Sequence, residues 1–143
     1  MIKVIGYSTK NINYSVIYNR SARVLDIESD TMSDDCIPYD ESTACMVWLD
    51  KDNVLCEIEC IFPVETNKPD SYINKIVQSS EVLPILRVKN EEKIVEIFVS
   101  DTQLILTINK NKKSDKKCVV KNLIFHISGD EVVAIESTNF KII

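Results

Sequence analysis

Apolar and polar residues alternate with a period of two along nearly the whole chain, and this pattern limits the possible folds more than any other feature. Successive side chains of a β-strand point to opposite faces, so this alternation is typical of strands with one buried face. Candidate strands occupy residues 2–7, 14–18, 22–28, 45–50, 54–62, 84–89, 93–99, 103–109, 119–127 and 131–137. Only PDSYINKIVQS, near residues 70–79, has the spacing of a short amphipathic helix. The sequence predicts a mostly β fold, which is α+β by strict count.

An internal similarity predicts two copies of one structural unit. The segment MVWLDKDNVLCEIE (46–59) aligns without a gap with LIFHISGDEVVAIE (123–136), and Trp48 then corresponds to Phe125. Each segment has the form of a hairpin, with Asp-Asn or Gly-Asp at a turn that requires positive φ. We expect a single domain, 1–143, with repeat units at about 12–62 and 93–137 and a linker helix and strand at 63–92.

The two units are expected to share one core. A chain of roughly 45–50 residues rarely buries enough apolar surface to fold alone. We therefore predict two similar antiparallel four-stranded units packed as a sandwich or half-barrel. On the strand at 54–62, the even-numbered residues from Val54 to Phe62 are assigned to the core, whereas Glu57 and Glu59 mark a solvated face.

The motifs of each unit resemble a short β-rich bacterial family of unknown function. The first unit reads YN at 18–19, VLDI at 24–27 and DKDNVLCEIE at 50–59; the second reads F at 98, LIL at 104–106 and SGDEVVAIE at 128–136. Members of that family read Tyr-Asp, then Leu-Tyr-Ile, and close with Asp-x-x-Gly-x-Val-x-Gly-Ile-Glu. The first copy lacks the glycines and the second lacks Tyr-Asp. The resemblance implies a hairpin-based fold and supplies no catalytic residues.

Composition excludes several classes of function. The chain has 2 glycines and 1 histidine, which excludes glycine-rich phosphate loops and zinc sites with two histidines. A net charge of −5 argues against binding to nucleic acid or to a membrane surface. Neither a transmembrane segment nor a secretory signal is recognisable, so the expected location is cytoplasmic.

The five cysteines are expected to be unpaired. Cys56 and Cys60 lie on one predicted strand, which places their Cα atoms about 13 Å apart, too far for a disulfide. We interpret all five as small buried hydrophobic residues in a reducing cytosol. They are Cys36, Cys45, Cys56, Cys60 and Cys118.

Two loops of opposite charge occupy equivalent places in the two units. The first, DIESDTMSDDCIPYDE (26–41), contains no basic residue, and the second, NKNKKSDKK (109–117), contains five lysines. Such loops can simply be solvated and mobile. They can also attract each other, within one molecule or across a homodimer, or the acidic loop can steer a basic partner.

We find no arrangement of residues that predicts catalysis, a metal site or a cofactor. Cys118 or Cys45 could act as a nucleophile with His126 only if the fold brought thiol and imidazole together. The acidic run lacks the alternating carboxylates and the central glycine of an EF-hand loop.

The leading functional hypothesis is a non-enzymatic binding protein. Its most specific form is a cytoplasmic immunity protein that neutralises a bacterial toxin, a protein partner with a basic domain, through its acidic loop. The alternative is a structural or accessory protein, for example of a phage, that acts through oligomerisation. The predicted partner-binding residues are Asp30, Asp34, Asp35, Tyr39, Asp40 and Glu41.

Overall fold

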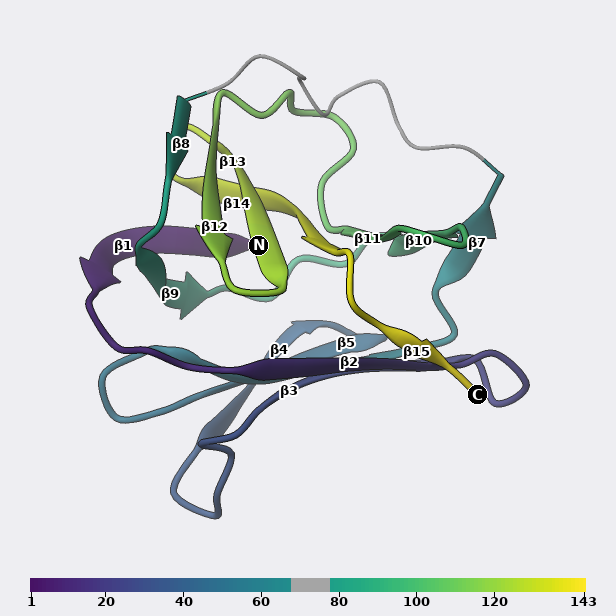
Figure 1. Ribbon diagram of the computed structural model, residues 1–143, viewed down its shortest axis with the longest axis horizontal. Coiled ribbons are helices and arrows are strands. Elements are labelled where there is room, and N and C mark those ends of the chain that lie inside the picture. The colour runs from purple at the N-terminus through teal and green to yellow at the C-terminus, as the bar shows by residue number, and fades with distance from the viewer. Residues whose placement is uncertain (68–77) are drawn as a thin grey trace.

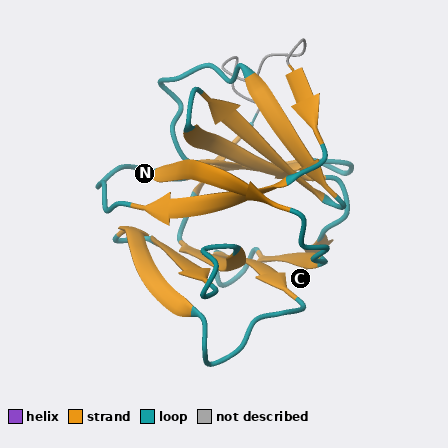
Figure 2. Ribbon diagram, turned by 90° about the vertical axis from the view of Figure 1, so that its left-hand side faces the viewer, coloured by secondary structure: helices purple, strands orange, loops and turns teal. Residues whose placement is uncertain are grey.

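The computed structural model describes residues 1–67 and 78–143, and in these residues the chain forms two β-sheets packed face to face (Figures 1 and 2). The predicted mostly β sandwich is confirmed, and no helix occurs in the described part. Most of the helix predicted near 70–79 lies outside the described residues. Its last two residues, Gln78 and Ser79, begin a strand instead.

The smaller sheet, sheet B, has the strand order β15-β2-β3-β6-β5-β4 and lies along the lower side of Figure 1. Its strands are β2 (Tyr14–Asn19), β3 (Val24–Ser29), β4 (Ile37–Ser42), β5 (Cys45–Leu49), β6 (Leu55–Ile61) and β15 (Lys141–Ile142). All of its pairings are antiparallel except that of β15 with β2, which is parallel.

The larger sheet, sheet A, follows the order β7-β10-β11-β14-β13-β12-β8, and β1 joins it through β14 and β9. Its strands are β1 (Ile2–Ser8), β7 (Val64–Thr66), β8 (Gln78–Ser80), β9 (Leu83–Val88), β10 (Glu96–Val99), β11 (Leu104–Thr107), β12 (Lys116–Val120), β13 (Leu123–Ser128) and β14 (Glu131–Ser137). The segment predicted as one strand at 119–127 is a hairpin, because the chain turns at Lys121 with φ 54°.

The two units have the same strand order. Strands β2 to β6 are arranged as β2-β3-β6-β5-β4, and β10 to β14 as β10-β11-β14-β13-β12, so each unit holds five strands rather than four. Each unit is followed by a strand that joins the sheet of the other unit. Strand β7, directly after the first unit, pairs in parallel with β10, and β15, after the second unit, pairs in parallel with β2. This is the arrangement that two copies of one unit would produce. Sequence duplication itself stays a prediction.

The strand register corrects the gap-free alignment. In the first hairpin Trp48 pairs with Glu57, and the corresponding bulged position of the second hairpin is His126, paired with Ala134. Phe125 therefore corresponds to Val47, one residue before Trp48. The first hairpin has one more residue in its turn, and a shift of one residue moves a side chain to the other face of a strand.

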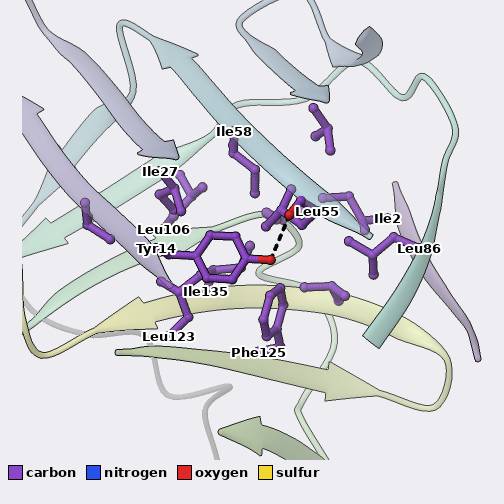
Figure 3. Close-up of a cluster of buried hydrophobic side chains, with 14 of the residues drawn as sticks. Ile2, Tyr14, Ile27, Leu55, Ile58, Leu86, Leu106, Leu123, Phe125 and Ile135 are labelled. Atoms are coloured by element: carbon purple, nitrogen blue, oxygen red, sulfur yellow. Dashed lines mark hydrogen bonds between the residues drawn. The ribbon is translucent and has the colours of Figure 1, made fainter. Parts of the chain in front are cut away.

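The core lies between the two sheets (Figure 3). Phe125 from sheet A and Ile58 from sheet B are both fully buried. Tyr14 also points into this layer, and its hydroxyl donates a hydrogen bond of 2.7 Å to the carbonyl oxygen of Leu55. Phe62, expected in the core, is instead 61% exposed and lies under the Arg23 guanidinium.

Two of the cysteines are not free, which corrects the sequence interpretation. Cys36 forms a disulfide with Cys56, with Cα atoms 6.7 Å apart. The bond joins the end of the loop between β3 and β4 to strand β6. Sequence spacing could not reveal it, because the two residues are 20 positions apart and only the sheet brings them together.

Candidate functional site

The outer face of sheet B, which points away from sheet A, carries two rows of side chains that run across the strands. In the first row Trp48 on β5 lies beside Glu57 on β6, which lies beside Glu28 on β3. The second row contains Asp40, Met46, Glu59 and Asp26, from β4, β5, β6 and β3. We call the four central carboxylates the acidic face; they are Asp26, Glu28, Glu57 and Glu59.

The described part of the chain does not neutralise the acidic face. In residues 1–67 and 78–143, no lysine, arginine or histidine forms an ion pair with any of its four carboxylates. Other acidic residues differ in this respect: Asp50 and Asp52 share Lys10, and Glu131 is paired with Lys112. The acidic face therefore carries negative charge that no cation in the described part of the chain compensates.

The equivalent surface of the second unit retains only one of the four carboxylates, Glu136 in the place of Glu59. The register places Ala134 where the first unit has Glu57, and Ile105 where it has Asp26. Both residues are buried in an apolar cluster with Phe98. The acidic face is therefore specific to the first unit and is not a by-product of the common fold.

Crowding of like charges changes the titration of this surface. Partial burial, a hydrogen bond with Asp26 and repulsion from Glu28, Asp26 and Glu59 together raise the pKa of Glu57 to about 7. One carboxylate oxygen of Asp26, Oδ1, is buried without a hydrogen-bond partner in the described structure. Asp26, Glu57 and Glu59 each offer an oxygen within 4.8 Å of the others, so they could hold a hard cation such as Ca²⁺.

Glu57 makes folding stability depend on pH. Because its pKa is raised to about 7 from 4.5, the folded state binds this proton more tightly than the unfolded chain. Its stabilising contribution is complete below pH 4.5 and is lost as the pH rises through 7. We expect Glu57→Gln to increase the free energy of unfolding at pH 8 by about 1–2 kcal/mol, a value reduced for solvent screening of this half-buried group.

Urea unfolding of both proteins at pH 5 and pH 8 measures this difference, with Glu81→Gln as the control because Glu81 is exposed and distant from the acidic face in the sheet order. The control should follow the wild type at both pH values. Equal stability of Glu57→Gln and wild type at pH 8 would show that ionised Glu57 does not destabilise the acidic face.

The loop residues predicted as a partner-binding site lie on the same side as the acidic face. The loop between β3 and β4 extends below sheet B, away from sheet A (Figure 1). Asp30, Asp34 and Asp35 are exposed on it. Asp30 accepts a hydrogen bond of 3.2 Å from the Asn13 amide group. The Cys36–Cys56 disulfide fixes the end of this loop to the sheet.

The three consecutive residues Tyr39, Asp40 and Glu41 do not form one surface. They lie on strand β4, so their side chains alternate between faces. Only Asp40 joins the outer face. Tyr39 lies on the opposite side, where it lines a hollow with Leu49 and Arg87. Glu41 is 0% exposed and bonded to Lys93 and the amino group of Met1, so it cannot contact a surface partner.

Sequence reasoning missed Trp48 as part of the surface. The gap-free alignment matched Trp48 with Phe125 and assigned it no surface role, whereas the structure places Trp48 half-buried beside Glu57. Strand parity alone identified Glu57 and Glu59. The signal that could have found Trp48 is the same parity applied to β5, where Cys45, Val47 and Leu49 are the buried residues.

His126 is not placed for nucleophilic catalysis. It is 3% exposed, and its Nε2 lies 2.8 Å from Oε1 of Glu136. This bond lowers the pKa of Glu136, which also accepts a bond from Gln103. No described cysteine is hydrogen-bonded to the imidazole; Cys118 contacts the hydroxyl of Ser80 instead.

Part of the basic loop is already neutralised within its own unit. Lys110 pairs with Glu96 at 3.1 Å and Lys112 with Glu131 at 2.9 Å. Neither lysine is bound to the acidic loop of the first unit. The oligomerisation hypothesis requires the two loops to attract each other. Fewer lysines are free for this attraction than the sequence suggests, because Lys110 and Lys112 are already paired.

Among the described residues there is no helix, and so none long and apolar enough to cross a membrane. Comparison of the chain with models of known protein families and with curated proteins yields no match. The acidic face is therefore interpreted from its own chemistry.

Proposed function

We propose that this chain is a non-enzymatic binding protein that recognises a basic protein through the acidic face and the adjoining loop between β3 and β4. Its most specific form is an immunity protein that occupies the basic active site of a bacterial toxin. The observation that carries this proposal is that no ion pair reaches the four carboxylates from the described residues, whereas Asp50, Asp52, Glu96 and Glu131 are each paired with a lysine.

The composition of the surface also favours a protein partner over a small ion. Trp48 and Met46 border the carboxylates, and such side chains are enriched where interfaces bury most binding energy. A lysine or arginine of the partner would relieve the repulsion that raises the pKa of Glu57, so binding would release a proton near neutral pH. Affinity should therefore increase between pH 6 and pH 8.

Two variants of equal charge test the proposal. The first carries Asp26→Asn, Glu57→Gln and Glu59→Gln; the second carries Asp101→Asn, Glu81→Gln and Glu91→Gln, at exposed positions outside the acidic face. The partner is isolated with the wild-type protein, and calorimetry gives its dissociation constant with each variant. At about 1 kcal/mol per carboxylate, we expect on the order of 100-fold weaker binding for the first variant only.

An equal loss in both variants would mean that only net charge matters and would contradict a defined binding face. Unchanged binding in both variants would show that the acidic face does not bind the partner. The affinity of the wild type should also fall with added salt, because exposed charges are screened within about 10 Å at 0.1 M. The titration is repeated with a chelator present, and an unchanged dissociation constant excludes a cation that bridges the two proteins.

The compartment in which binding takes place is part of the same proposal. A cytoplasmic location is the expectation from the sequence, but the Cys36–Cys56 disulfide is a feature that reducing compartments seldom allow. Cell fractionation followed by alkylation of free thiols would decide between the cytoplasm and an oxidising compartment, because a cytoplasmic protein would carry Cys36 in the reduced form.

A further inference from the structure

Cys45 and Cys60 occupy the strand position at which two side chains approach most closely. They are direct partners in the antiparallel pairing of β5 with β6. The amide of Ile61 donates to the carbonyl oxygen of Ala44 at 2.8 Å, one position outside the pair. This bond marks Cys45 and Cys60 as a non-hydrogen-bonded pair, for which Cα atoms lie about 4.5 Å apart. That separation lies within the range that disulfides require.

The two sulfur atoms already face each other. The Cys60 thiol points at Sγ of Cys45 across 3.1 Å. Both residues are 1% exposed, and neither thiol has another described hydrogen-bond partner. A small rotation of the two side chains would bring the sulfur atoms to bonding distance, and no backbone movement is required because the register is already correct.

The neighbouring Cys36–Cys56 disulfide shows that strand β6 carries oxidised cysteine. Cys60 lies on the same strand, four residues beyond Cys56. We propose that Cys45 and Cys60 form a second disulfide, which joins β5 to β6 across the core face of sheet B. The two thiols lose two electrons and two protons, a sulfur–sulfur bond forms, and a low-molecular-weight disulfide such as oxidised glutathione is reduced to two thiols.

Burial determines when this reaction takes place. The proximity of Cys45 and burial raise the pKa of the Cys60 thiol well above its ordinary value, so the folded protein offers almost no reactive thiolate. The bond therefore forms during folding, before sheet A covers the pair. Once formed, it is protected from external reductants for the same reason, unlike a disulfide at an exposed loop.

The full chain refolded in a mixture of reduced and oxidised glutathione tests this. Free thiols are blocked with iodoacetamide under denaturing conditions, and trypsin is combined with a glutamate-specific protease. These enzymes place each of the four cysteines on its own peptide. We expect a linked peptide pair containing Cys45 and Cys60, beside the pair containing Cys36 and Cys56, and blocking only at Cys118. Alkylation of both Cys45 and Cys60 alongside an intact Cys36–Cys56 bond would overturn the proposal.

Two double variants separate this bond from the known one. In Cys36→Ser/Cys56→Ser, the Cys45–Cys60 peptide pair should persist, because its geometry depends only on the hairpin. In Cys45→Ser/Cys60→Ser, that pair should disappear while the Cys36–Cys56 pair remains. Circular dichroism confirms that each variant is folded. Loss of the Cys45–Cys60 link in a folded Cys36→Ser/Cys56→Ser variant would show that it is secondary to the first disulfide.

Discussion

Replacement of Lys93 by methionine should lower the free energy of unfolding by about 3 kcal/mol, because it deprives the buried Glu41 carboxylate of one of its two cationic partners. Glu41 is completely buried on β4, and one of its oxygens accepts bonds from both the Lys93 ammonium group and the amino group of Met1. The other oxygen has no partner in the described structure. Equilibrium unfolding in urea measures the loss.

A double variant distinguishes a buried unpaired charge from lost packing. In Glu41→Gln/Lys93→Met the carboxylate is replaced by a neutral amide of the same shape, so about half of the lost stability should return. Lys113→Met is the control for removal of a lysine, since Lys113 is exposed. If the single and double variants are equally unstable, the charge of Glu41 does not contribute to the cost.

This ion pair also explains why Glu41, one of the predicted partner-binding residues, is not accessible to a partner. The sequence places Glu41 at the end of a run of acids, which is typical of an exposed loop. The chain instead forms an edge strand there, and a bulge after Asp40 directs Glu41 inward, where Lys93 approaches from the other half of the chain. A contact between residues 52 positions apart has no signal in local composition.

Alternation was sufficient to predict the central strands. β2, β3, β5, β6 and β14 lie within one or two residues of their predicted ranges, because each is a run of apolar residues with at least one buried face. The outer strand β4 and the short strands β7, β8 and β15 were not predicted. Outer strands of a sheet bury little, so their sequences need not alternate. The acidic face follows the same logic: parity identified Glu57 and Glu59, but their neighbours depend on pairing between distant strands.

The gap-free alignment of the two hairpins was wrong by one residue in the first strand of each hairpin, because Phe125 corresponds to Val47 and not to Trp48. One pair of substitutions tests this correction. Phe125→Ala should cost about 3–5 kcal/mol, since the ring is fully buried between the sheets and its removal leaves a cavity. Trp48→Ala should cost only about 1 kcal/mol, because the larger ring lies half-buried on the outer face beside Glu57. Urea unfolding of both variants gives the two values.

The gap-free alignment makes the opposite prediction. If Trp48 and Phe125 occupied equivalent positions, both rings would fill the shared core and both substitutions would be severely destabilising. With the observed register the two variants also separate by function: Trp48→Ala should weaken binding of a basic partner, whereas Phe125→Ala should leave the affinity of the remaining folded molecules unchanged. A Trp48→Ala protein that is as unstable as Phe125→Ala would place Trp48 in the core and remove the aromatic border from the acidic face.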